Sequence, residues 1–355
     1  MSFVNSLSQT QFLLNAINSQ NQQLSVLQQI VSSGGQKSQD FSGFTPAVGK
    51  LDLTFNAQIA RNSAYSGTLA TLATRTANIE TALTSADSAI NSLNNTIVTL
   101  NNQDPTGTSV QETAQSTLEQ VVDQFNANTN GVPLFSGVAL NSANAPSYPI
   151  ASATALQTGL QTAIGAAPGF ASVAQAQAAV TNYFATTSNW FVPGAAGVPA
   201  AAAQVADDQT VQASVTANPS VPAGNPFGAA IRDTLAQTTG TAVIKASDFS
   251  DYNAATGTSA LYQQYLVSQN GTLDTASTEL NNAVAVNGIV RGQLGTLQTV
   301  NDTSTNLLQQ GLDAATVQDV AESVTTLNNL QTQLQATYQV TAQLKGLSLA
   351  NFLPA

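Results

Sequence analysis

Carboxylates and lysine amines are the only strong acid–base groups available for catalysis in this sequence, because it contains no histidine and no cysteine. Imidazole bases, thiolate nucleophiles, disulfides and the usual zinc sites are thereby excluded. Asp207 and Asp208 form the only adjacent carboxylate pair, and no further ligand lies at helical or hairpin spacing from them. No glycine-rich stretch has the Lys-Ser/Thr context of a phosphate-binding loop. We therefore expect Asp207 and Asp208 to lie in a solvated loop, and we expect no enzyme activity, no metal and no cofactor.

The net charge of the chain indicates which classes of binding partner are unfavourable. The 355 residues include 8 Lys and Arg against 19 Asp and Glu, for a formal charge of −11. This balance argues against nucleic acid and anionic membranes as partners. Only 8% of residues are charged, where about 25% is usual, and Asn, Gln, Ser and Thr fill the polar positions. No apolar run reaches the roughly 20 residues of a membrane span. The first residues lack a basic and then an apolar region, so we expect no cleaved signal peptide and no membrane insertion.

A heptad pattern of apolar residues predicts one long helix between Leu51 and Leu100. Alternating steps of four and three residues from Leu51 meet apolar side chains at twelve of fifteen positions, and the last seven are unbroken. This spacing is typical of a helix in a coiled-coil-like bundle, and Pro105 ends the pattern. The expected core residues of this helix are Leu72, Ile79, Leu83, Ile90, Leu93, Ile97 and Leu100.

A second heptad pattern, later in the chain, predicts the partner of that helix. Its core residues are Leu273, Leu280 and Leu294. Asn287 and Asn301 occupy two further core positions, where a buried asparagine fixes register at a cost in stability. The second helix can lie antiparallel beside the first. The expected fold is therefore mainly α: an elongated antiparallel helical bundle or coiled coil made from both halves of the chain.

The composition changes between the two helical halves. From about residue 141 to 255 the chain is rich in Ala, Gly and Pro, with short β-branched or aromatic runs at Val180–Phe184 and Val211–Val215. Turn signals separate these runs. We expect a small inserted domain of mixed strands and short helices at 141–258.

Shorter signals flank the long helices. Ser109–Glu112 reads as a capping box that starts a shorter helix, and Gly131–Gly137 reads as an irregular segment. The arginines of the long helices are expected to form ordinary surface ion pairs, which contribute little individually. They are Arg61, Arg75 and Arg291.

Both ends of the chain are amphipathic over more than one helix face. Two such helices paired with each other would still leave apolar surface in water, so we interpret them as interaction helices that gain order when packed against other copies. A head-to-tail contact of this kind generates an open polymer. The alternative is that both ends fold back onto the central helices as ordinary core. The candidate self-assembly residues are Phe3, Leu13, Ile17, Leu24, Leu27, Val31, Val320, Val324, Leu327, Leu334, Tyr338, Leu344, Leu347 and Leu349.

At these ends the sequence resembles the flagellins and the related hook–filament junction proteins of the bacterial flagellum. The closing stretch Leu344–Leu353 is similar to the final motif of that family, and Val317–Glu322 and Leu334–Tyr338 are similar to segments upstream of it. The N-terminal half matches in layout, so the resemblance covers about 1–140 and 260–355. Pro133–Gly137 is similar to a Leu-Phe-Ser-Gly signature common in the junction type.

The resemblance implies a structural subunit of the flagellum that is exported through the flagellar type III channel. Its paired terminal helices would line the inner core of a tube, in an extracellular filament or at the hook–filament junction, with the junction type slightly favoured. Its partners would be other copies of itself, the neighbouring junction, hook and cap proteins, and an export chaperone. A non-flagellar secreted coiled-coil adhesin or translocator remains as the alternative.

The resemblance and the patterns together predict five segments. A self-assembly helix and spoke occupy 1–44, and the first half of the long-helix bundle occupies 45–140. The variable surface domain at 141–258 follows. The second half of the bundle occupies 259–304, and the C-terminal self-assembly helix occupies 305–355.

Overall fold

The computed structural model divides the chain into two compact units, each of which is made from residues of both chain halves. It describes residues 14–25, 27–28, 31, 46–100, 103–137, 149–166, 168–191, 202–207, 209–212, 215–218, 225–317 and 320–350. Unit 1 consists of Met1–Ala73, Ala202–Val211 and Gln293–Ala355, and unit 2 of Thr74–Ala201 and Gln212–Gly292. The segment expected as an insert, 141–258, is not a separate unit in this division. Most of it belongs to unit 2, and residues 202–211 belong to unit 1.

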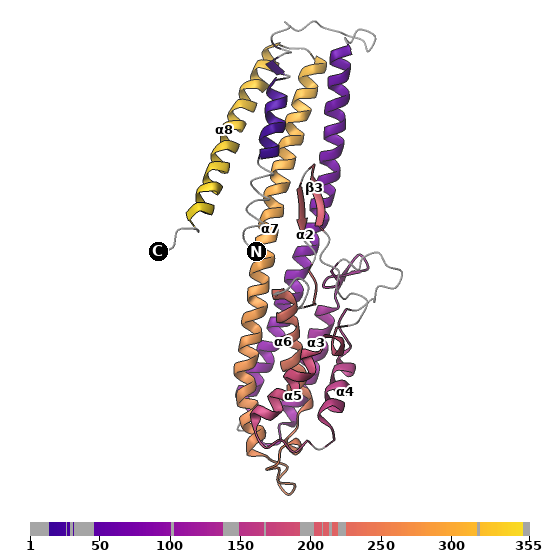
Figure 1. The fold of residues 1–355 in the computed structure, drawn as a ribbon, viewed down its shortest axis with the longest axis vertical. Helices are drawn as coiled ribbons and strands as arrows, with labels where there is room; N and C mark the ends of the chain where they lie inside the picture. Colours follow the sequence, from indigo (N-terminus) through magenta and orange to yellow (C-terminus); the bar gives the residue numbers. More distant parts are fainter. Residues whose placement is uncertain are drawn as a thin grey trace. The chain divides into compact units, whose positions relative to one another are not determined.

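Two long helices contribute to both units, as the heptad patterns predict. They are α2 (Pro46–Leu100) and α7 (Ala260–Val317) (Figure 1). In unit 2, the Asn94 side chain donates to Asp274 at 2.7 Å, and Asn287 donates to the carbonyl of Thr76 at 2.7 Å. The partner numbers fall along α7 as they rise along α2, so the two helices are antiparallel there. The expected mainly α bundle made from both chain halves is therefore observed.

The α2–α7 seam also runs antiparallel within unit 1. The Gln298 amide donates to the Ser66 hydroxyl at 2.8 Å, and the Asn301 amide donates to the carbonyl of Asn62 at 2.9 Å. Phe55 is buried and lies close to Gly311, where a Cβ would stand 3.2 Å from its ring. Bulk at residue 311 would therefore compete with this aromatic side chain for the same space.

The expected core residues of the long helices lie on the seam. Leu72 and Leu100 are half-buried, and Leu100 packs against the core of unit 2. The remaining predicted core residues are buried, namely Ile79, Leu83, Ile90, Leu93, Ile97, Leu273, Leu280 and Leu294. Apolar spacing along one face of each helix thus marks the face that is removed from water.

Asn287 shows how the seam holds its register. Its buried amide donates to the carbonyl of Thr76, an oxygen that the helical pattern already pairs with the amide of Glu80. Replacing Asn287 by leucine therefore leaves no backbone group of α2 unsatisfied and adds apolar burial. We expect Asn287→Leu to raise the free energy of unfolding by about 1 kcal/mol, measured by urea denaturation. Asn282→Leu, at an exposed position of the same helix, should change it little. A marked loss of stability in Asn287→Leu would contradict this account.

The shorter helix α3 (Thr108–Phe125) starts differently from the capping box expected at Ser109. Its N-cap is Gly107, which has a left-handed φ of 72° and makes no side-chain cap. The Asp104 carboxylate instead accepts from the backbone N–H of Gly107 at 3.0 Å and of Ser109 at 2.7 Å. Burial acts to raise the pKa of Asp104, but hydrogen bonds from Thr106 and from these N–H groups outweigh it and hold the pKa below its usual value. The prediction of a capping box was wrong because Asp104, a residue outside that motif, accepts hydrogen bonds from the free N–H groups at the start of the helix.

A tight hairpin follows α3 within the segment expected to be irregular. Strands β1 (Asn128–Thr129) and β2 (Val132–Pro133) pair antiparallel, with Asn128 opposite Pro133. The connecting Asn130 and Gly131 have φ values of 53° and 78°. Both angles are positive, as a two-residue type I′ turn requires, and Asn-Gly is the dipeptide that adopts them most readily.

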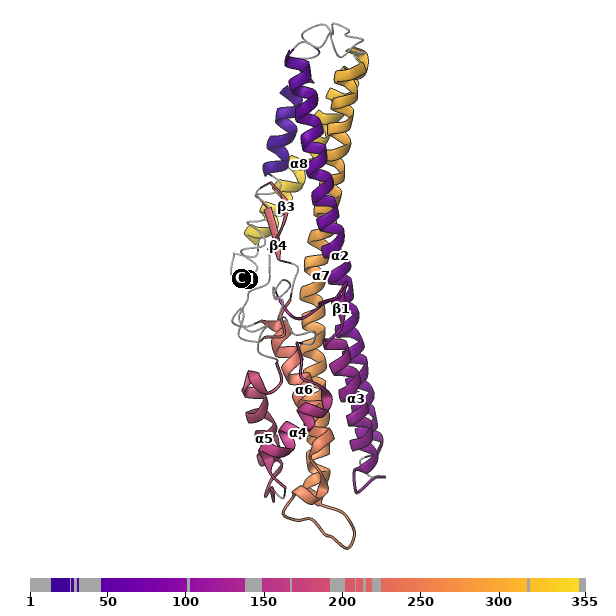
Figure 2. The ribbon, with the colours of Figure 1, turned by 90° about the vertical axis from the view of Figure 1, so that its right-hand side faces the viewer.

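The rest of unit 2 is mostly helical. Helix α6 (Pro226–Val243) lies at its centre and contacts α3, α4 (Ala153–Ile164) and α5 (Val173–Ala185), and the short 3₁₀ helices η2 (Thr187–Asn189) and η3 (Ala246–Asp248) complete the unit (Figure 2). Two of the threonines buried on α6 return their hydroxyls to its own backbone, Thr238 to the Thr234 carbonyl at 2.7 Å and Thr241 to the Gln237 carbonyl at 2.8 Å. These two side chains are thereby satisfied inside a helix that is buried almost all round, whereas the hydroxyls of Thr234 and Thr239 are buried without a partner.

The run Val180–Phe184, expected as a short β-branched and aromatic stretch, lies in α5. Val180, Tyr183 and Phe184 are buried at helical spacing, and the Ser172 hydroxyl caps the helix by accepting from the Gln175 N–H at 3.3 Å. The Ala- and Gln-rich residues before Val180 favour helix, and burial of one face then outweighs β propensity. The run Val211–Val215 does enter a strand: β3 (Ala202–Ala206) and β4 (Gln209–Gln212) form a two-stranded sheet in unit 1.

Candidate assembly interface

The described parts of both chain ends are helical and pack against one another in unit 1. Residues 14–25, 27–28 and 31 are helical, and we call them the N-terminal helix. Leu27 packs with Leu307 of α7 and Leu330 of α8 (Val320–Ala350). The Asn21 amide lies 3.4 Å from the Tyr338 hydroxyl. In these two contacts the residue number falls along the N-terminal helix as it rises along α8, so the two helices are antiparallel. Helix α7 contacts both of them at the leucine cluster Leu27, Leu307 and Leu330.

This packing covers only part of the apolar surface of the ends. Ile17, Leu27 and Leu334 are buried. In contrast, Leu14 is 45% exposed, Val324 is 38% exposed and Tyr338 is 49% exposed. Isolated exposed apolar residues are ordinary, but here three of them lie on two paired helices. These exposed side chains are the free surface that the candidate interface offers to a neighbour.

The other predicted self-assembly residues divide into two groups. Leu24, Val31 and Leu327 are half-buried, and Leu24 and Leu327 border the leucine cluster. Phe3 and Leu13 lie outside the described residues. Four further residues belong to α8, but their side chains lie outside the described part: Val320, Leu344, Leu347 and Leu349.

Three contributors to this site were not among the predicted assembly residues, namely the exposed Leu14 and the buried Leu307 and Leu330. Leu307 closes the cluster from α7, and Leu330 is its most buried member on α8 at 1% exposure. Leu330 belongs to a second apolar stripe on α8 beside the predicted one, so its spacing carried the signal. No sequence signal identified Leu307, because its partners, Leu27 and Leu330, are more than twenty residues away in the sequence.

That the terminal helices gain order when packed against other copies stays a prediction. Their described parts are packed within unit 1. The reason is the apolar face of α7, which continues beyond the heptad residues to Leu307 and Leu308 and gives the ends a surface to cover. This part of the packing corresponds to the alternative in which the ends fold onto the central helices.

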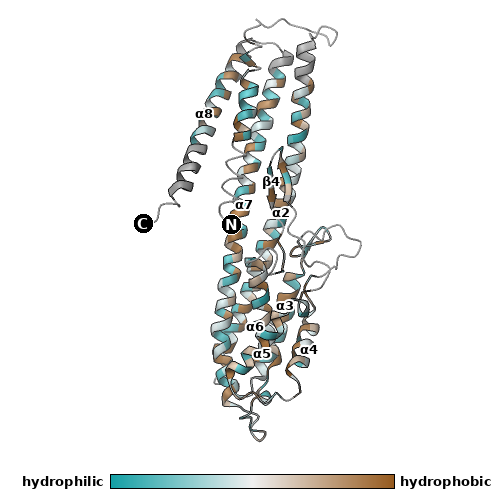
Figure 3. Cartoon of the chain, viewed as in Figure 1, coloured by the Kyte–Doolittle hydropathy of each residue, from teal (hydrophilic) through white to brown (hydrophobic). Residues whose placement is uncertain are grey.

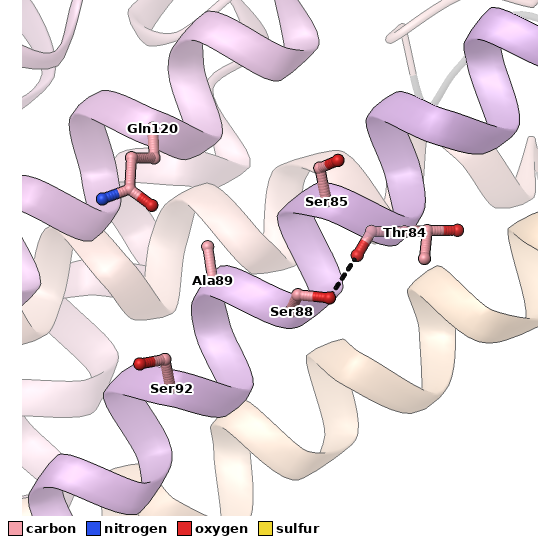
Figure 4. A pocket seen from close by; sticks show the side chains of 6 residues that line it. All are labelled: Thr84, Ser85, Ser88, Ala89, Ser92 and Gln120. Atoms are coloured by element: carbon pink, nitrogen blue, oxygen red, sulfur yellow. Dashed lines mark hydrogen bonds between the residues drawn. The ribbon is translucent and has the colours of Figure 1, made fainter.

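No described group of side chains suggests catalysis. Asp207 lies at the turn between β3 and β4, where its carboxylate accepts from Arg61 at 3.3 Å and from the Tyr65 hydroxyl at 2.9 Å. Asp208 lies outside the described residues. Among the described residues, no cluster of three or more acidic, histidine or cysteine side chains is present that could hold a metal ion. An open groove of about 350 Å³ on α2 and α3 is lined by Thr84, Ser85, Ser88, Ala89, Ser92 and Gln120, none of them titratable (Figure 4).

Arg75 departs from the surface pairing expected of the helix arginines. It is buried and donates to the carbonyls of Pro133 at 2.7 Å and Leu134 at 2.8 Å. Burial lowers the pKa of its guanidinium. Arg61 and Arg291 do form exposed ion pairs, with Asp207 and Glu80.

The segment that Arg75 holds is the Leu-Phe-Ser-Gly stretch named above. Leu134 and Phe135 are buried, and the Phe135 ring meets Phe125 edge-on at 5.9 Å. Beyond them, the Gly137 N–H donates to the Val215 carbonyl at 3.0 Å. The Ala217 N–H likewise donates to the Phe135 carbonyl at 2.8 Å, so the stretch connects α3 to residues 215–217.

An acidic pair between α6 and α7 makes the stability of unit 2 depend on pH. Burial, a hydrogen bond with Asp233 and the negative charge of Asp233 raise the pKa of Glu279 to about 7, and Arg232 opposes the shift. In the folded state Glu279 thus keeps its proton up to a higher pH than in the unfolded state. Stability therefore falls as pH rises from about 4.5 to about 7.

We expect Glu279→Gln to remove most of the decrease in stability between pH 4.5 and pH 7. The wild-type free energy of unfolding should drop by roughly 1 kcal/mol across the window, because the partial exposure of the side chain screens the effect. Denaturation at pH 5 and at pH 7.5 measures the drop. The lowered pKa of Asp104 acts with the opposite sign and in a separate window, below pH 4. An equal change of stability with pH in wild type and in Glu279→Gln would show that Glu279 is not the group responsible for the pH dependence.

None of the described helices is long and apolar enough to cross a membrane. Polar and apolar residues are interleaved along α2 and α7 (Figure 3).

No protein-family model and no curated relative matches this chain. A solved structure from Vibrio parahaemolyticus, of a protein provisionally described as flagellar hook-associated, is similar to it. The TM-score is 0.50 at 14% sequence identity, and the match covers 76% of this chain and 98% of that chain. At this level of identity the similarity establishes a common fold.

Proposed function

We propose that this protein is a structural subunit of the bacterial flagellum that assembles through its paired terminal helices. The observation that carries the proposal is the match to the Vibrio parahaemolyticus protein, which includes 98% of that protein's chain. The resemblance of residues 344–353 to the closing motif of the flagellin family supports it independently, because that resemblance rests on the sequence and not on the fold.

The terminal helices supply the physical mechanism. They present apolar side chains at Leu14, Val324 and Tyr338, and residues 14–31 and 324–344 contain no charged side chain. Contacts between copies would therefore be apolar and amide-mediated. A contact that repeats head to tail extends without closing and produces a tube.

In this role the subunit is exported through the flagellar type III channel and acts outside the cell, in motility. Its partners are copies of itself, the neighbouring junction, hook and cap proteins, and an export chaperone. We favour the junction over the filament because of the Leu-Phe-Ser-Gly stretch at 134–137. Arg75 donates to the carbonyl of Leu134, its first residue, and to that of the preceding Pro133.

Immunogold labelling of intact cells tests the proposal. Antibody against this chain, applied to wild-type cells and to cells that lack its gene, should label flagella only in the wild type. Label restricted to the base of the appendage supports the junction, and label along its whole length supports the filament. Label elsewhere on the surface, with flagella unlabelled, would favour the secreted adhesin or translocator and would contradict a flagellar role.

A further inference from the structure

The chain contains three Asn-Gly dipeptides, and the structure places them in different surroundings. They are Asn130-Gly131, Asn270-Gly271 and Asn287-Gly288. In such a dipeptide the glycine has no Cβ that would keep its backbone nitrogen from the side-chain carbonyl carbon of the asparagine. Two of the three dipeptides lie inside α7, and the third forms the turn between β1 and β2. Their chemistry is the same, so the fold decides which of them can react.

Helix α7 protects its two Asn-Gly dipeptides. In a helix the N–H of Gly271 and that of Gly288 donate to the carbonyls four residues before them, which holds each nitrogen away from the asparagine side chain. The Asn287 side chain is fixed as well, because it is buried and its amide donates to the Thr76 carbonyl at 2.7 Å. Neither dipeptide can react without local opening of α7.

The Asn130-Gly131 turn lacks this protection. Both residues are exposed. Apart from the two chain neighbours of Gly131, no atom of the described chain lies within 4 Å of the position that a Cβ would take there. The turn lies at the tip of the hairpin, outside the β1–β2 ladder. Among the described residues, Asn130 is also the one non-glycine residue with a positive φ, at 53°, so leaving the turn relieves a less favourable backbone conformation.

We propose that Asn130 is a site of spontaneous deamidation in the folded protein. The backbone nitrogen of Gly131 attacks the Cγ atom of Asn130 and forms a C–N bond. The bond from Cγ to the side-chain nitrogen breaks, and that nitrogen takes up the proton of the glycine N–H and leaves as ammonia. Water then adds to one of the two carbonyls of the resulting succinimide and opens the ring to aspartate or isoaspartate. Water is the only co-reactant, and the inference is independent of the proposed function.

The isoaspartate product changes the backbone of the hairpin as well as its charge. Its main chain runs through the side chain of residue 130 and is longer by one methylene group, so a two-residue type I′ turn no longer fits between β1 and β2. The hairpin leads directly into the stretch that Arg75 holds through the carbonyls of Pro133 and Leu134. On the other strand, the Thr129 hydroxyl accepts from the Asn78 amide at 2.8 Å. Deamidation therefore loosens residues 128–134 irreversibly.

Peptide mapping of aged full-length protein tests the site. Folded protein is incubated at mildly alkaline pH and digested, and isoaspartate is measured by mass spectrometry and by enzymatic methylation. The peptide with Asn130 should gain isoaspartate at least about tenfold faster than the peptides with Asn270 or Asn287, because these need opening of α7. In protein unfolded by guanidinium chloride the three rates should converge.

Two results would overturn the assignment of the site. Equal rates at the three dipeptides of the folded protein, or no isoaspartate at residue 130, would show that the turn is not the reactive position. A difference between the sites that persists in the unfolded chain would show that the flanking sequence selects the site and the fold does not.

Asn130→Gly is the matched control. Gly-Gly also adopts a type I′ turn, so this variant keeps the hairpin but has no side-chain amide at residue 130. Hydrogen exchange of the Leu134 N–H, which donates to the Ala127 carbonyl at 2.9 Å, should become at least about tenfold faster in aged wild type that carries isoaspartate. It should stay unchanged in aged Asn130→Gly and in fresh Asn130→Asp, which adds the charge without the methylene group. Unchanged exchange in the isoaspartate form would contradict the proposed loosening.

Discussion

Replacing Val324 and Tyr338 together by aspartate is expected to abolish assembly while unit 1 stays folded. Both side chains lie on α8 and are exposed, at 38% and 49%. Two carboxylates at these positions stay hydrated in the isolated chain, so helicity by circular dichroism and the urea midpoint should remain close to wild type. In a contact between copies they would be desolvated without a cationic partner, because residues 14–31 and 324–344 contain no charged side chain. We expect at least a hundredfold loss of polymer by electron microscopy and sedimentation.

The conservative pair Val324→Ile and Tyr338→Phe is the control for that experiment. It keeps the apolar surface and should assemble as wild type does. Leu334→Asp, in contrast, combines two effects, since Leu334 is only 5% exposed. It should also unpack the terminal helices of the isolated chain. Normal polymer formation by the Val324/Tyr338 aspartate variant would show that these two side chains are not part of the interface between copies.

Replacing Arg75 by methionine is expected to lower the free energy of unfolding of unit 2 by about 2–4 kcal/mol. The guanidinium donates to the carbonyls of Pro133 and Leu134 at 2.7 and 2.8 Å. Methionine fills part of the space but leaves these acceptors without that donor. A buried hydrogen bond from a charged group contributes about 1.5–3 kcal/mol, and an unsatisfied acceptor carries its full desolvation penalty. The Pro133 carbonyl retains the Ser136 hydroxyl at 3.1 Å, which keeps the loss below the sum of two full bonds.

Arg291→Met provides the matched comparison for Arg75. Arg291 is also a helix residue of unit 2, but its ion pair with Glu80 is solvent-exposed, so its loss should change stability by less than about 1 kcal/mol. Urea unfolding followed by far-UV circular dichroism measures both variants. Equal stability of the two variants would show that the contact with the Leu-Phe-Ser-Gly stretch does not stabilise unit 2.

Periodic sequence information predicted the long helices well. A heptad pattern needs only the spacing of apolar residues along one segment, and burial of that face follows for any partner that covers it. The same local logic placed Asn287 and Asn301 on the seam, where both amides now reach backbone carbonyls of α2. It did not identify Val180–Phe184 as helical, because this run, in which four of five residues favour strands, reveals neither the helix-forming stretch before it nor the face that α5 buries.

The amino-acid sequence by itself thus determined the helical class, the antiparallel seam and the uncharged, apolar character of the two ends. Only the tertiary structure decided that Arg75 is buried against Pro133 and Leu134, and that Gln20 and Gln23 of the N-terminal helix are buried. The physical reason is that apolar periodicity is a property of one segment. Whether a buried polar side chain finds a hydrogen-bond partner depends on which other segment packs over it. The spacing of residues within one segment does not specify this partner segment.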